Sequence, residues 1–472
     1  MGKRYKKSKC RLKGVIIFSA ALIIAVLALF LAYKHFYEGN SENSESFVSS
    51  KAEESEIVDN REIKSISGTI YDSTMQTLTL ETVDGKRYEF LKETDKLEVP
   101  QSGTMVGAPV KVDYKGDLEN MQDVTVIKIT VSEIEIPKVS NTAEDILAEM
   151  TLEEKVGQMF IARCPENNAV QSVGQYHLGG YILFARDFEN KSKEQVNSNI
   201  KSYNNQSKIN MFIGVDEEGG IVNRISRYSQ FRLVPFKSPQ DLYNEGGWEL
   251  IESDTLEKCE LLRSMGINMN FAPVCDVCTD PSDYMYSRSF GKDAAMTAQY
   301  VTKVVSVMNK ENINCVLKHF PGYGNNEDTH TGIAYDNRPY SDFENSDFIP
   351  FSAGINAGAG TVLVSHNVVY CMDPERPASL SKEVHRILRE ELGFDGVIIT
   401  DDLFMDAVKS YASDEETAVM AITAGNDLLC STDFEVQFQS VMSAVNRGEI
   451  SEDRINESVL RILRLKLKLG II

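Results

Sequence analysis

After its first residues the sequence has far fewer basic than acidic side chains. Residues 1–13 hold seven lysines and arginines and no acid, whereas the whole chain of 472 residues has a formal net charge of −21. The chain after residue 13 is therefore strongly acidic. Because a nucleic-acid partner requires a basic surface that contacts phosphates, this distribution argues against nucleic acid as a partner.

The sequence also lacks the short motifs of nucleotide and metal sites. No GxGxxG or GxxxxGKS/T segment occurs at a strand–helix junction, which argues against a doubly wound sheet that binds nucleotides. There is no His-x-His pair and no His-Glu-x-x-His segment, so we predict no metal and no cofactor. The one Asp-x-His pattern, at Asp328 and His330, leaves a metallohydrolase as an alternative.

The cysteine pattern of the sequence does not indicate a disulfide framework. Of the eight cysteines, Cys10 lies in the basic N-terminal segment. The other seven, an odd number, are scattered among apolar neighbours, and we interpret them as small core residues. Cys275 and Cys278 have the spacing of a redox or metal pair, but the sequence offers no second pair and no adjacent histidine.

One long uncharged segment follows the basic cluster. Residues 14–33 match the length of a helix that crosses a bilayer, and the basic residues 1–13 are expected to stay cytoplasmic. A cleavable signal peptide is the alternative, but its apolar region is usually shorter, and Phe30 stands where a small residue would be needed. No cysteine follows closely, which disfavours a lipoprotein. We therefore predict a single-pass protein of the cell membrane, with the chain after residue 34 extracellular.

The composition changes twice beyond this predicted anchor. Residues 34–60 are rich in Ser, Glu and Asn, which is typical of a flexible linker. Residues 61–138 contain short alternating apolar runs, with Asp84-Gly85 as a hairpin signal between two of them. We predict a small all-β module there, without a recognisable site.

From residue 139 to residue 472 strand-like and helix-like segments alternate. Thr142 can cap a first helix, and Thr151 with Glu154 forms the capping box of a second. Continuous apolar runs separated by amphipathic stretches indicate a parallel sheet covered by helices. The apolar runs are Tyr181–Phe184, Met211–Val215, Met269–Val274, Cys315–Leu317, Val362–Val364, Val397–Ile399 and Leu428–Cys430.

Polar side chains follow four of these runs. They are Asp216, Lys318 with His319, His366, and Asp401 with Asp402. Catalytic groups at strand carboxyl ends are typical of a (β/α)8 TIM barrel, so this α/β fold class is the predicted fold of residues 139–472.

The stretch from Leu317 to Gly332 carries the most reactive groups. Lys318 and His319 are followed by a segment that contains Pro321, Gly322 and Gly324, which indicates a loop. Asp328 and His330 come after it. An aspartate two residues from a histidine can orient the imidazole and favour its protonated form, so we predict a proton-transfer dyad. A nucleophilic carboxylate and a proton donor that face each other are the minimum set of catalytic groups for displacement at a sugar anomeric carbon.

The sequence from Met150 to Ile472 resembles glycoside hydrolase family 3, and within it the bacterial β-N-acetylglucosaminidases. The resemblance implies a retaining exo-glycosidase with Asp401 as nucleophile, His330 as acid/base and Asp328 as its partner. It also implies that five residues bind the sugar, namely Asp216, Arg224, Arg288, Lys318 and His319. The matching segments are Met150–Phe160, Leu178–Phe184, Val215–Gly220, Asn270–Val274, Arg288–Gly291, Lys318–Gly322, Asp328–His330 and Gly393–Leu403.

Three features depart from the family pattern. Tyr323 replaces a second histidine, Thr329 replaces a serine, and the segment from Lys318 to Asp328 is one residue shorter.

Apolar residues at helical spacing, among them Val459, Ile462 and Leu463, predict the closing helix of the barrel. No second α/β domain follows in this sequence, so we expect barrel loops alone to complete the site.

Together these features predict an extracellular catalytic domain that removes terminal β-linked N-acetylglucosamine from peptidoglycan fragments. Carbohydrate is the predicted partner, with the membrane contacted through the N-terminal helix. A β-glucosidase or β-xylosidase of the same family, or a catalytically inactive wall-binding protein, remains the alternative.

Overall fold

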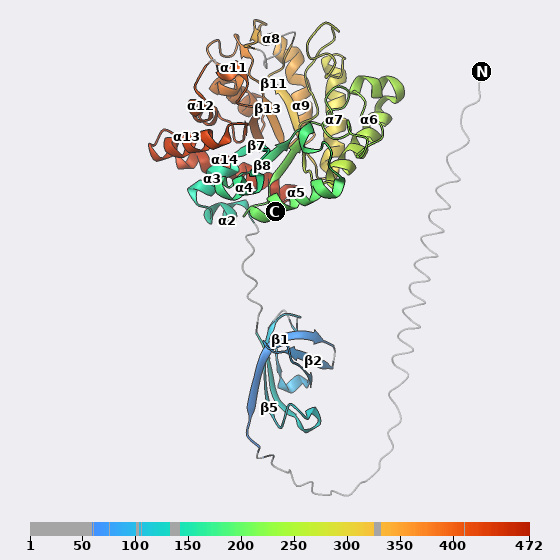
Figure 1. Ribbon diagram of the computed structural model, residues 1–472, viewed down its shortest axis with the longest axis vertical. Coiled ribbons are helices and arrows are strands. Elements are labelled where there is room, and N and C mark those ends of the chain that lie inside the picture. The colour runs from blue at the N-terminus through green and yellow to red at the C-terminus, as the bar shows by residue number, and fades with distance from the viewer. Residues whose placement is uncertain are drawn as a thin grey trace, which may run out of the picture. The chain divides into compact units, whose positions relative to one another are not determined.

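The computed structural model describes residues 59, 61–74, 76–100, 103–104, 106–132, 142–324, 332–409 and 411–472 (Figure 1). The predicted basic tail and anchor, residues 1–33, lie outside these ranges, as do Asp328 and His330. Within the described ranges no helix has the length and apolar character needed to cross a membrane. The chain divides into two compact units, one before residue 136 and one from that residue on.

The first unit is a six-stranded sheet with the strand order β3-β2-β1-β5-β6-β4. Its neighbouring strands pair antiparallel, except that β4 pairs parallel with β6. The turn at Asp84-Gly85 separates β2 from β3, and Gly85 has a φ of 81°, which suits glycine. The strands are β1 (Lys64–Ser73), β2 (Thr77–Glu81), β3 (Arg87–Leu91), β4 (Leu97–Glu98), β5 (Pro109–Lys115) and β6 (Thr125–Val131).

Buried and partly exposed side chains alternate along the strands of this sheet. Leu78 and Leu80 on β2 are fully buried, while Thr77 and Thr79, which alternate with them, are not. Because successive side chains of a strand point to opposite faces, one face of the sheet forms a small apolar core that includes Phe90.

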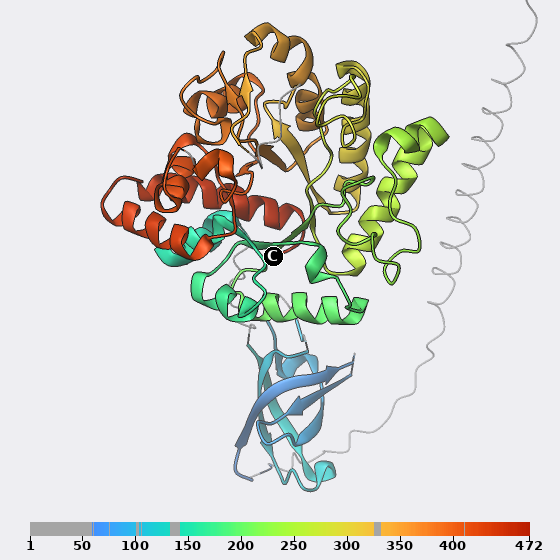
Figure 2. The ribbon, with the colours of Figure 1, turned by 45° about the horizontal axis from the view of Figure 1, so that its top comes forward.

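The second unit is a nearly closed barrel of eight parallel strands (Figure 2). The strand order is β15-β13-β11-β10-β9-β8-β7-β16, and a parallel bridge between Ile399 and Leu428 joins the two ends of the sheet. This arrangement confirms the predicted barrel. The strands are β7 (Phe160–Arg163), β8 (Gly180–Leu183), β9 (Phe212–Val215), β10 (Met269–Asn270), β11 (Asn314–Phe320), β13 (Thr361–Val364), β15 (Val397–Thr400) and β16 (Leu429–Ser431).

Seven of these strands match the predicted apolar runs, and β7 does not. Its apolar residues follow directly after helix α3 (Leu152–Gln158), so the helical pattern masked the strand. The capping box of α3 is present, because the Thr151 hydroxyl accepts from the Glu154 N–H while the Glu154 carboxylate accepts from the Thr151 N–H.

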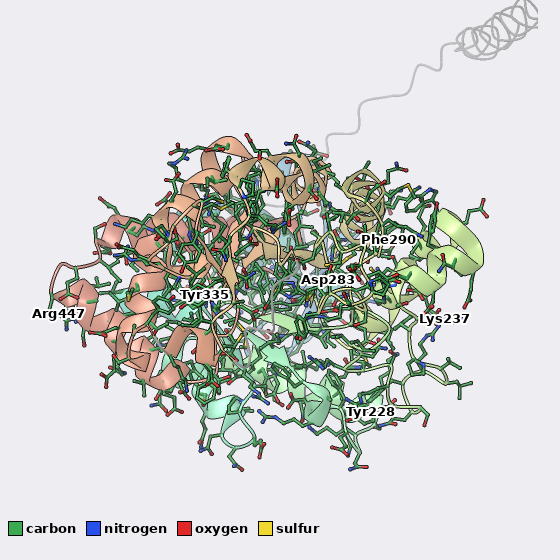
Figure 3. All side chains as sticks on the ribbon, turned by 90° about the horizontal axis from the view of Figure 1, so that it is seen from above. Tyr228, Lys237, Asp283, Phe290, Tyr335 and Arg447 are labelled. Carbon is green, nitrogen blue, oxygen red and sulfur yellow. The ribbon has the colours of Figure 1, made fainter. Side chains whose placement is uncertain are left out.

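Helices cover the outside of the barrel between successive strands (Figures 1 and 2). Side chains fill the barrel unit seen from above, with Lys237 and Arg447 at opposite edges and Asp283 nearer the middle (Figure 3). The longer helices are α2 (Ala143–Ala148), α4 (Ala169–Tyr176), α5 (Lys193–Gln206), α6 (Pro239–Ser264), α7 (Ala294–Lys310), α9 (Phe348–Asn356), α10 (Lys382–Arg386), α12 (Asp414–Ala424), α13 (Phe434–Asn446) and α14 (Glu452–Lys468).

The last helix, α14, closes the barrel as predicted. Val459, Ile462 and Leu463 are fully buried on its inner face. Lys466 on the same helix is also buried, and its ammonium group donates to the Gln158 side chain and to the Gly179 carbonyl. Because these acceptors precede β7 and β8, α14 seals the amino-terminal end of the barrel.

Candidate active site

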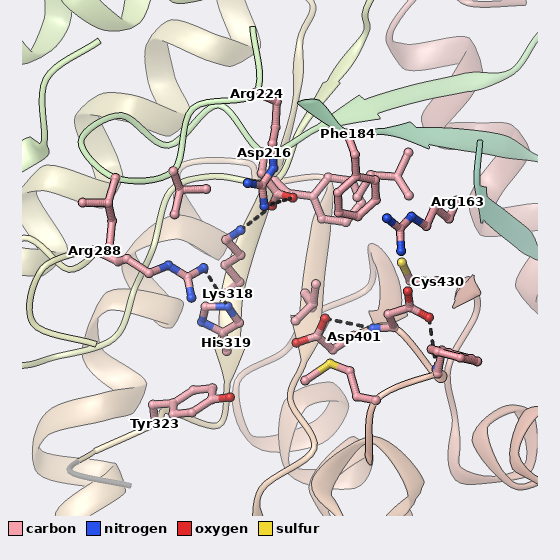
Figure 4. Close-up of a pocket in the computed structure, with 18 of the residues that line it drawn as sticks. Arg163, Phe184, Asp216, Arg224, Arg288, Lys318, His319, Tyr323, Asp401 and Cys430 are labelled. Carbon is pink, nitrogen blue, oxygen red and sulfur yellow. Dashed lines mark hydrogen bonds and ion pairs between the residues drawn. The ribbon is translucent and has the colours of Figure 1, made fainter. Parts of the chain in front are cut away.

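A cavity of about 550 Å³ opens at the carboxyl ends of the strands (Figure 4). It falls in the range of roughly 300–1,000 Å³ that is typical of small-molecule sites. The predicted residues that line it are Asp216, Arg224, Arg288, Lys318, His319 and Asp401. The barrel therefore brings these six together, although they are spread over nearly 190 residues of sequence.

Lys318, at the end of β11, lies at the centre of an ion-pair network. Its ammonium nitrogen is 2.8 Å from Asp216 Oδ1 and 2.7 Å from Glu218 Oε1. Burial lowers the pKa of the ammonium group, but the two carboxylates more than offset this and raise it above its ordinary value. Lys318 is therefore held as a fixed cation beside the loop that follows β9.

Arg288 forms a bidentate ion pair with the same glutamate, Glu218. Its Nε is 3.1 Å from Glu218 Oε2, and its Nη2 is 2.7 Å from Glu218 Oε1. Burial alone would raise the pKa of Glu218, but Lys318 and Arg288 hold that pKa well below its usual range. Such bidentate pairs fix direction as well as charge, so Glu218 aligns two cations toward the cavity.

His319 is oriented by Asp276. The Asp276 carboxylate lies 2.8 Å from His319 Nδ1 and also accepts from the backbone N–H groups of His319 and Tyr323. A carboxylate can only accept, so Nδ1 carries the proton and Nε2 faces the cavity side, 3.4 Å from Arg288 Nη2. The Tyr323 ring packs edge-on against His319, with 5.3 Å between the ring centroids. The departure at position 323 therefore places an aromatic wall beside His319.

Arg224 is placed by the buried Glu217 carboxylate. That carboxylate accepts hydrogen bonds from the backbone N–H groups of Arg224, Ile225 and Ser226, which folds the loop after β9. The Arg224 guanidinium then lies 3.5 Å from Asp216 Oδ2. Asp216 is thus approached by two cations, Arg224 and Lys318.

Asp401 and Asp402 follow β15 and differ in their surroundings. Asp401 is partly exposed in the cavity wall, and its Oδ1 accepts from the Asp402 N–H at 2.9 Å. Asp402 turns its carboxylate to the backbone N–H of Phe404 and to both the N–H and the hydroxyl of Thr432. Asp402 is therefore a loop anchor, as its omission from the predicted catalytic set implied.

His366 also holds the loop rather than lining the cavity. It is fully buried, and its ring nitrogens lie 2.7 Å from Ser379 Oγ and 3.1 Å from the Asp402 carbonyl oxygen. The sequence alone left its role open. The structure places it between β13 and the loop after β15.

The sequence interpretation missed several residues of this site. Glu217 and Glu218 lie inside the matched segment Val215–Gly220, so their carboxylates were visible but their partners were not. Asp276 lies between the two cysteines of the Cys275–Cys278 pattern, which drew attention to the sulfur atoms instead. Both cysteines are buried free thiols, and burial raises the pKa of each. The described residues contain no cluster of three potential metal ligands.

Comparison with known proteins extends over this whole barrel. The family model of the glycosyl hydrolase family 3 N terminal domain matches residues 151–465. The beta-hexosaminidase of Nitrosomonas eutropha is 31% identical over 299 residues, which cover 61% of this chain and 85% of that protein. A beta-hexosaminidase of Xanthomonas campestris is 30% identical over 275 residues, which cover 57% of this chain and 82% of the relative.

A solved structure agrees with these relatives. The family 3 beta-N-acetylglucosaminidase from Paenibacillus sp. aligns with a TM-score of 0.64 and 31% sequence identity. The alignment covers 68% of this chain and 63% of that chain.

Proposed function

Because the chain belongs to glycosyl hydrolase family 3 and is a glycoside hydrolase, we propose that it removes terminal β-linked N-acetylglucosamine with retention of configuration. One observation carries the proposal. The Asp401 carboxylate lines the same cavity as the buried network of Asp216, Lys318 and Arg288. A carboxylate beside a rigid set of charged hydrogen-bonding groups suits attack on a sugar that is held by its hydroxyls.

The network acts as the clamp for the sugar ring. Lys318 and Arg288 donate to sugar hydroxyls, while Asp216 accepts from them. Because these groups are already fixed by one another, little reorganisation is needed when the sugar binds. His319 adds Nε2 as a further polar group, and its direction is fixed because Nδ1–H donates to Asp276.

The reaction proceeds in two displacements. Asp401 attacks the anomeric carbon, the glycosidic bond breaks, and the leaving oxygen takes a proton from His330, which Asp328 orients. Water then attacks the glycosyl-enzyme from the opposite face, giving up its proton to the same histidine. The roles of His330 and Asp328 rest on the family resemblance.

The source of the substrate is a separate part of the proposal. The basic residues 1–13 and the apolar residues 14–33 support a membrane anchor with the barrel outside the cell, where peptidoglycan fragments are available. Protease treatment of intact cells tests this. Loss of the barrel from intact cells is expected, and protection until the cells are lysed would contradict it.

The activity is tested with the detergent-solubilised full chain on a panel of 4-nitrophenyl β-glycosides. The N-acetylglucosaminide should be cleaved fastest. Faster cleavage of the glucoside or xyloside would favour the other family activities. No cleavage of any glycoside would favour a wall-binding protein without catalysis.

Substitution of the nucleophile gives a sharper test. Asp401→Ala should lose turnover, and added azide should restore cleavage because it can occupy the space left by the carboxylate. Azide then attacks from the face that Asp401 used, so the product is the α-glycosyl azide. A fully active Asp401→Ala variant would exclude this role.

A further inference from the structure

Arg338 forms a second network of buried charges, separate from the sugar clamp. Its guanidinium lies between two aspartates whose side chains are almost completely buried. Nη2 is 2.8 Å from Asp336 Oδ2, and Nη1 is 2.8 Å from Asp347 Oδ2. The guanidinium carbon also lies 4.3 Å from the centroid of the Phe343 ring. One cation thus binds two carboxylates, which a planar fork of donors can do at the same time.

The turn Gly322–Gly324 packs directly on this network. Gly322 has a φ of 126° and Gly324 a φ of 56°. A Cβ atom at Gly324 would lie 2.6 Å from the guanidinium carbon of Arg338, and one at Gly322 would lie even closer to the Asp347 carboxylate. Both positions therefore require glycine, because the backbone of the turn contacts the ion pair without any side chain between them.

The same turn also contributes to the cavity. Tyr323, between the two glycines, lines the cavity (Figure 4), and its N–H donates to Asp276 Oδ1 at 2.8 Å. Asp276 is the carboxylate that orients His319. Arg338 and Asp276 therefore hold one turn through different contacts.

Asp336, the other partner of Arg338, lies further along the chain. It belongs to β12 (Tyr335–Asp336), which pairs parallel with β14 (Val368–Val369). Arg338 thus connects the turn that ends at residue 324 with the strand that begins at residue 335. Residues 325–331 lie between these two ends in the sequence.

The residues between these ends include Asp328 and His330, the acid/base pair of the proposed function. A segment with two fixed ends has fewer conformations than one with a free end, so fixed ends restrict where its side chains can go. We propose that Arg338 is a positioning residue for His330, which acts by fixing both ends of this segment. This inference rests on the proposed function, because it concerns the proton donor of that reaction.

Dependence on the leaving group distinguishes this role from a role in the sugar clamp. An aryl glycoside of a strongly acidic phenol needs little protonation to leave, whereas a weakly acidic phenol needs the general acid. A misplaced His330 should therefore slow only the second kind of substrate. A clamp disturbed through Tyr323 and His319 should slow both. The probes are 2,4-dinitrophenyl and phenyl β-N-acetylglucosaminide, and kcat/KM covers the steps up to cleavage of the glycosidic bond.

Arg338→Lys keeps a cation between the two aspartates but removes the fork. The kcat/KM for the phenyl glycoside should fall about 10- to 100-fold, the scale of a misplaced general acid, while that for the dinitrophenyl glycoside stays nearly unchanged. Arg389→Lys is the matched control. Arg389 also pairs with a fully buried aspartate, Asp427, and lies over the Phe394 ring, but it is outside the cavity lining. It should lower the melting temperature without changing the ratio of the two rates.

A second variant disturbs the network without removing the guanidinium. Gly324→Ala places a methyl group against Arg338 and should cause the same selective loss on the phenyl glycoside. Gly393→Ala is its control, because Gly393 has a similar φ of 68° but open space around its Cβ position among the described residues. Gly393→Ala should keep the wild-type ratio of rates. If Arg338→Lys does not fold, Gly324→Ala provides the test.

The outcomes are distinct. Equal losses on both glycosides in Arg338→Lys would overturn the proposal in favour of the sugar clamp. Wild-type rates in both Arg338→Lys and Gly324→Ala would overturn it as well. His330→Ala should show the same selective loss, but larger, and equal losses there would refute the acid/base assignment instead. A wild-type enzyme that cleaves neither glycoside would refute the proposed function itself.

Discussion

The Lys318 ammonium nitrogen lies 2.7 Å from Glu218 Oε1, and both side chains are only 3% exposed. Charges taken out of water are stable only when paired, so each of these residues depends on the other. Glu218 forms ion pairs with both Lys318 and Arg288. It therefore holds two cations of the cavity in position, although it does not contact the predicted nucleophile Asp401.

Glu218→Gln should destabilise the fold and weaken the sugar clamp together. Removing one partner of a buried pair costs about 3–5 kcal/mol, because Lys318 and Arg288 keep their charges. Thermal melting and kcat/KM measure the two effects. Glu245→Gln, which breaks the exposed pair with Lys237, should cost about 1 kcal/mol or less. Equal, small effects of both substitutions would contradict the central role of Glu218.

Asp276→Asn should reduce activity more than stability. The amide can donate as well as accept, so it no longer requires the proton on His319 Nδ1, and the orientation of the imidazole is no longer fixed. We expect kcat/KM to fall on the order of 100-fold, the scale of a misplaced binding group. Asp283→Asn, on the same loop but partly exposed, is the control. Wild-type activity in Asp276→Asn would mean that His319 needs no orientation.

Asp401→Asn should affect turnover, whereas Asp402→Asn at the neighbouring position should affect the stability of the fold. Asp401→Asn should abolish turnover with a nearly unchanged melting temperature. Asp402→Asn should lower the free energy of unfolding by about 1–3 kcal/mol, because its carboxylate satisfies the Thr432 and Phe404 donors. Kinetic assays and denaturant titration distinguish them. The reverse pattern would exchange the two assignments.

Lys466 should make stability depend on pH above neutrality. Burial lowers the pKa of Lys466 from 10.5 to about 7. Between these values the unfolded chain binds a proton that the folded chain does not, so the free energy of unfolding should rise as pH increases from about 7 to 10.5. Each pKa unit corresponds to about 1.4 kcal/mol.

Melting curves across this pH range test the effect. Lys466→Met should flatten the rise, whatever its stability at pH 7, because Met cannot bind a proton. The exposed Lys468 on the same helix gives the matched control, Lys468→Met, which should keep the wild-type slope. An unchanged slope in Lys466→Met would assign the pH dependence to other groups.

The sequence allowed much of the barrel to be predicted because its strands are continuous apolar runs with polar residues at their ends. Cys315–Leu317 followed by Lys318 and His319 is one such case, and Val397–Ile399 followed by Asp401 is another. The strand β7 was not predicted because its four residues follow almost directly after helix α3, with no turn residues to mark a boundary. The roles predicted for Asp401, His330 and Asp328 stay predictions, and the latter two lie outside the described residues.

Local sequence patterns were enough to identify the residue types available at the strand ends, since apolar periodicity and helix capping depend on near neighbours. Which charged side chains meet depends on the folded barrel. Lys318 reaches Asp216 across 102 residues, and Arg288 reaches Glu218 across 70. Closure of the barrel sets these partners. Pairing of this kind depends on distance in space, which local sequence patterns do not encode.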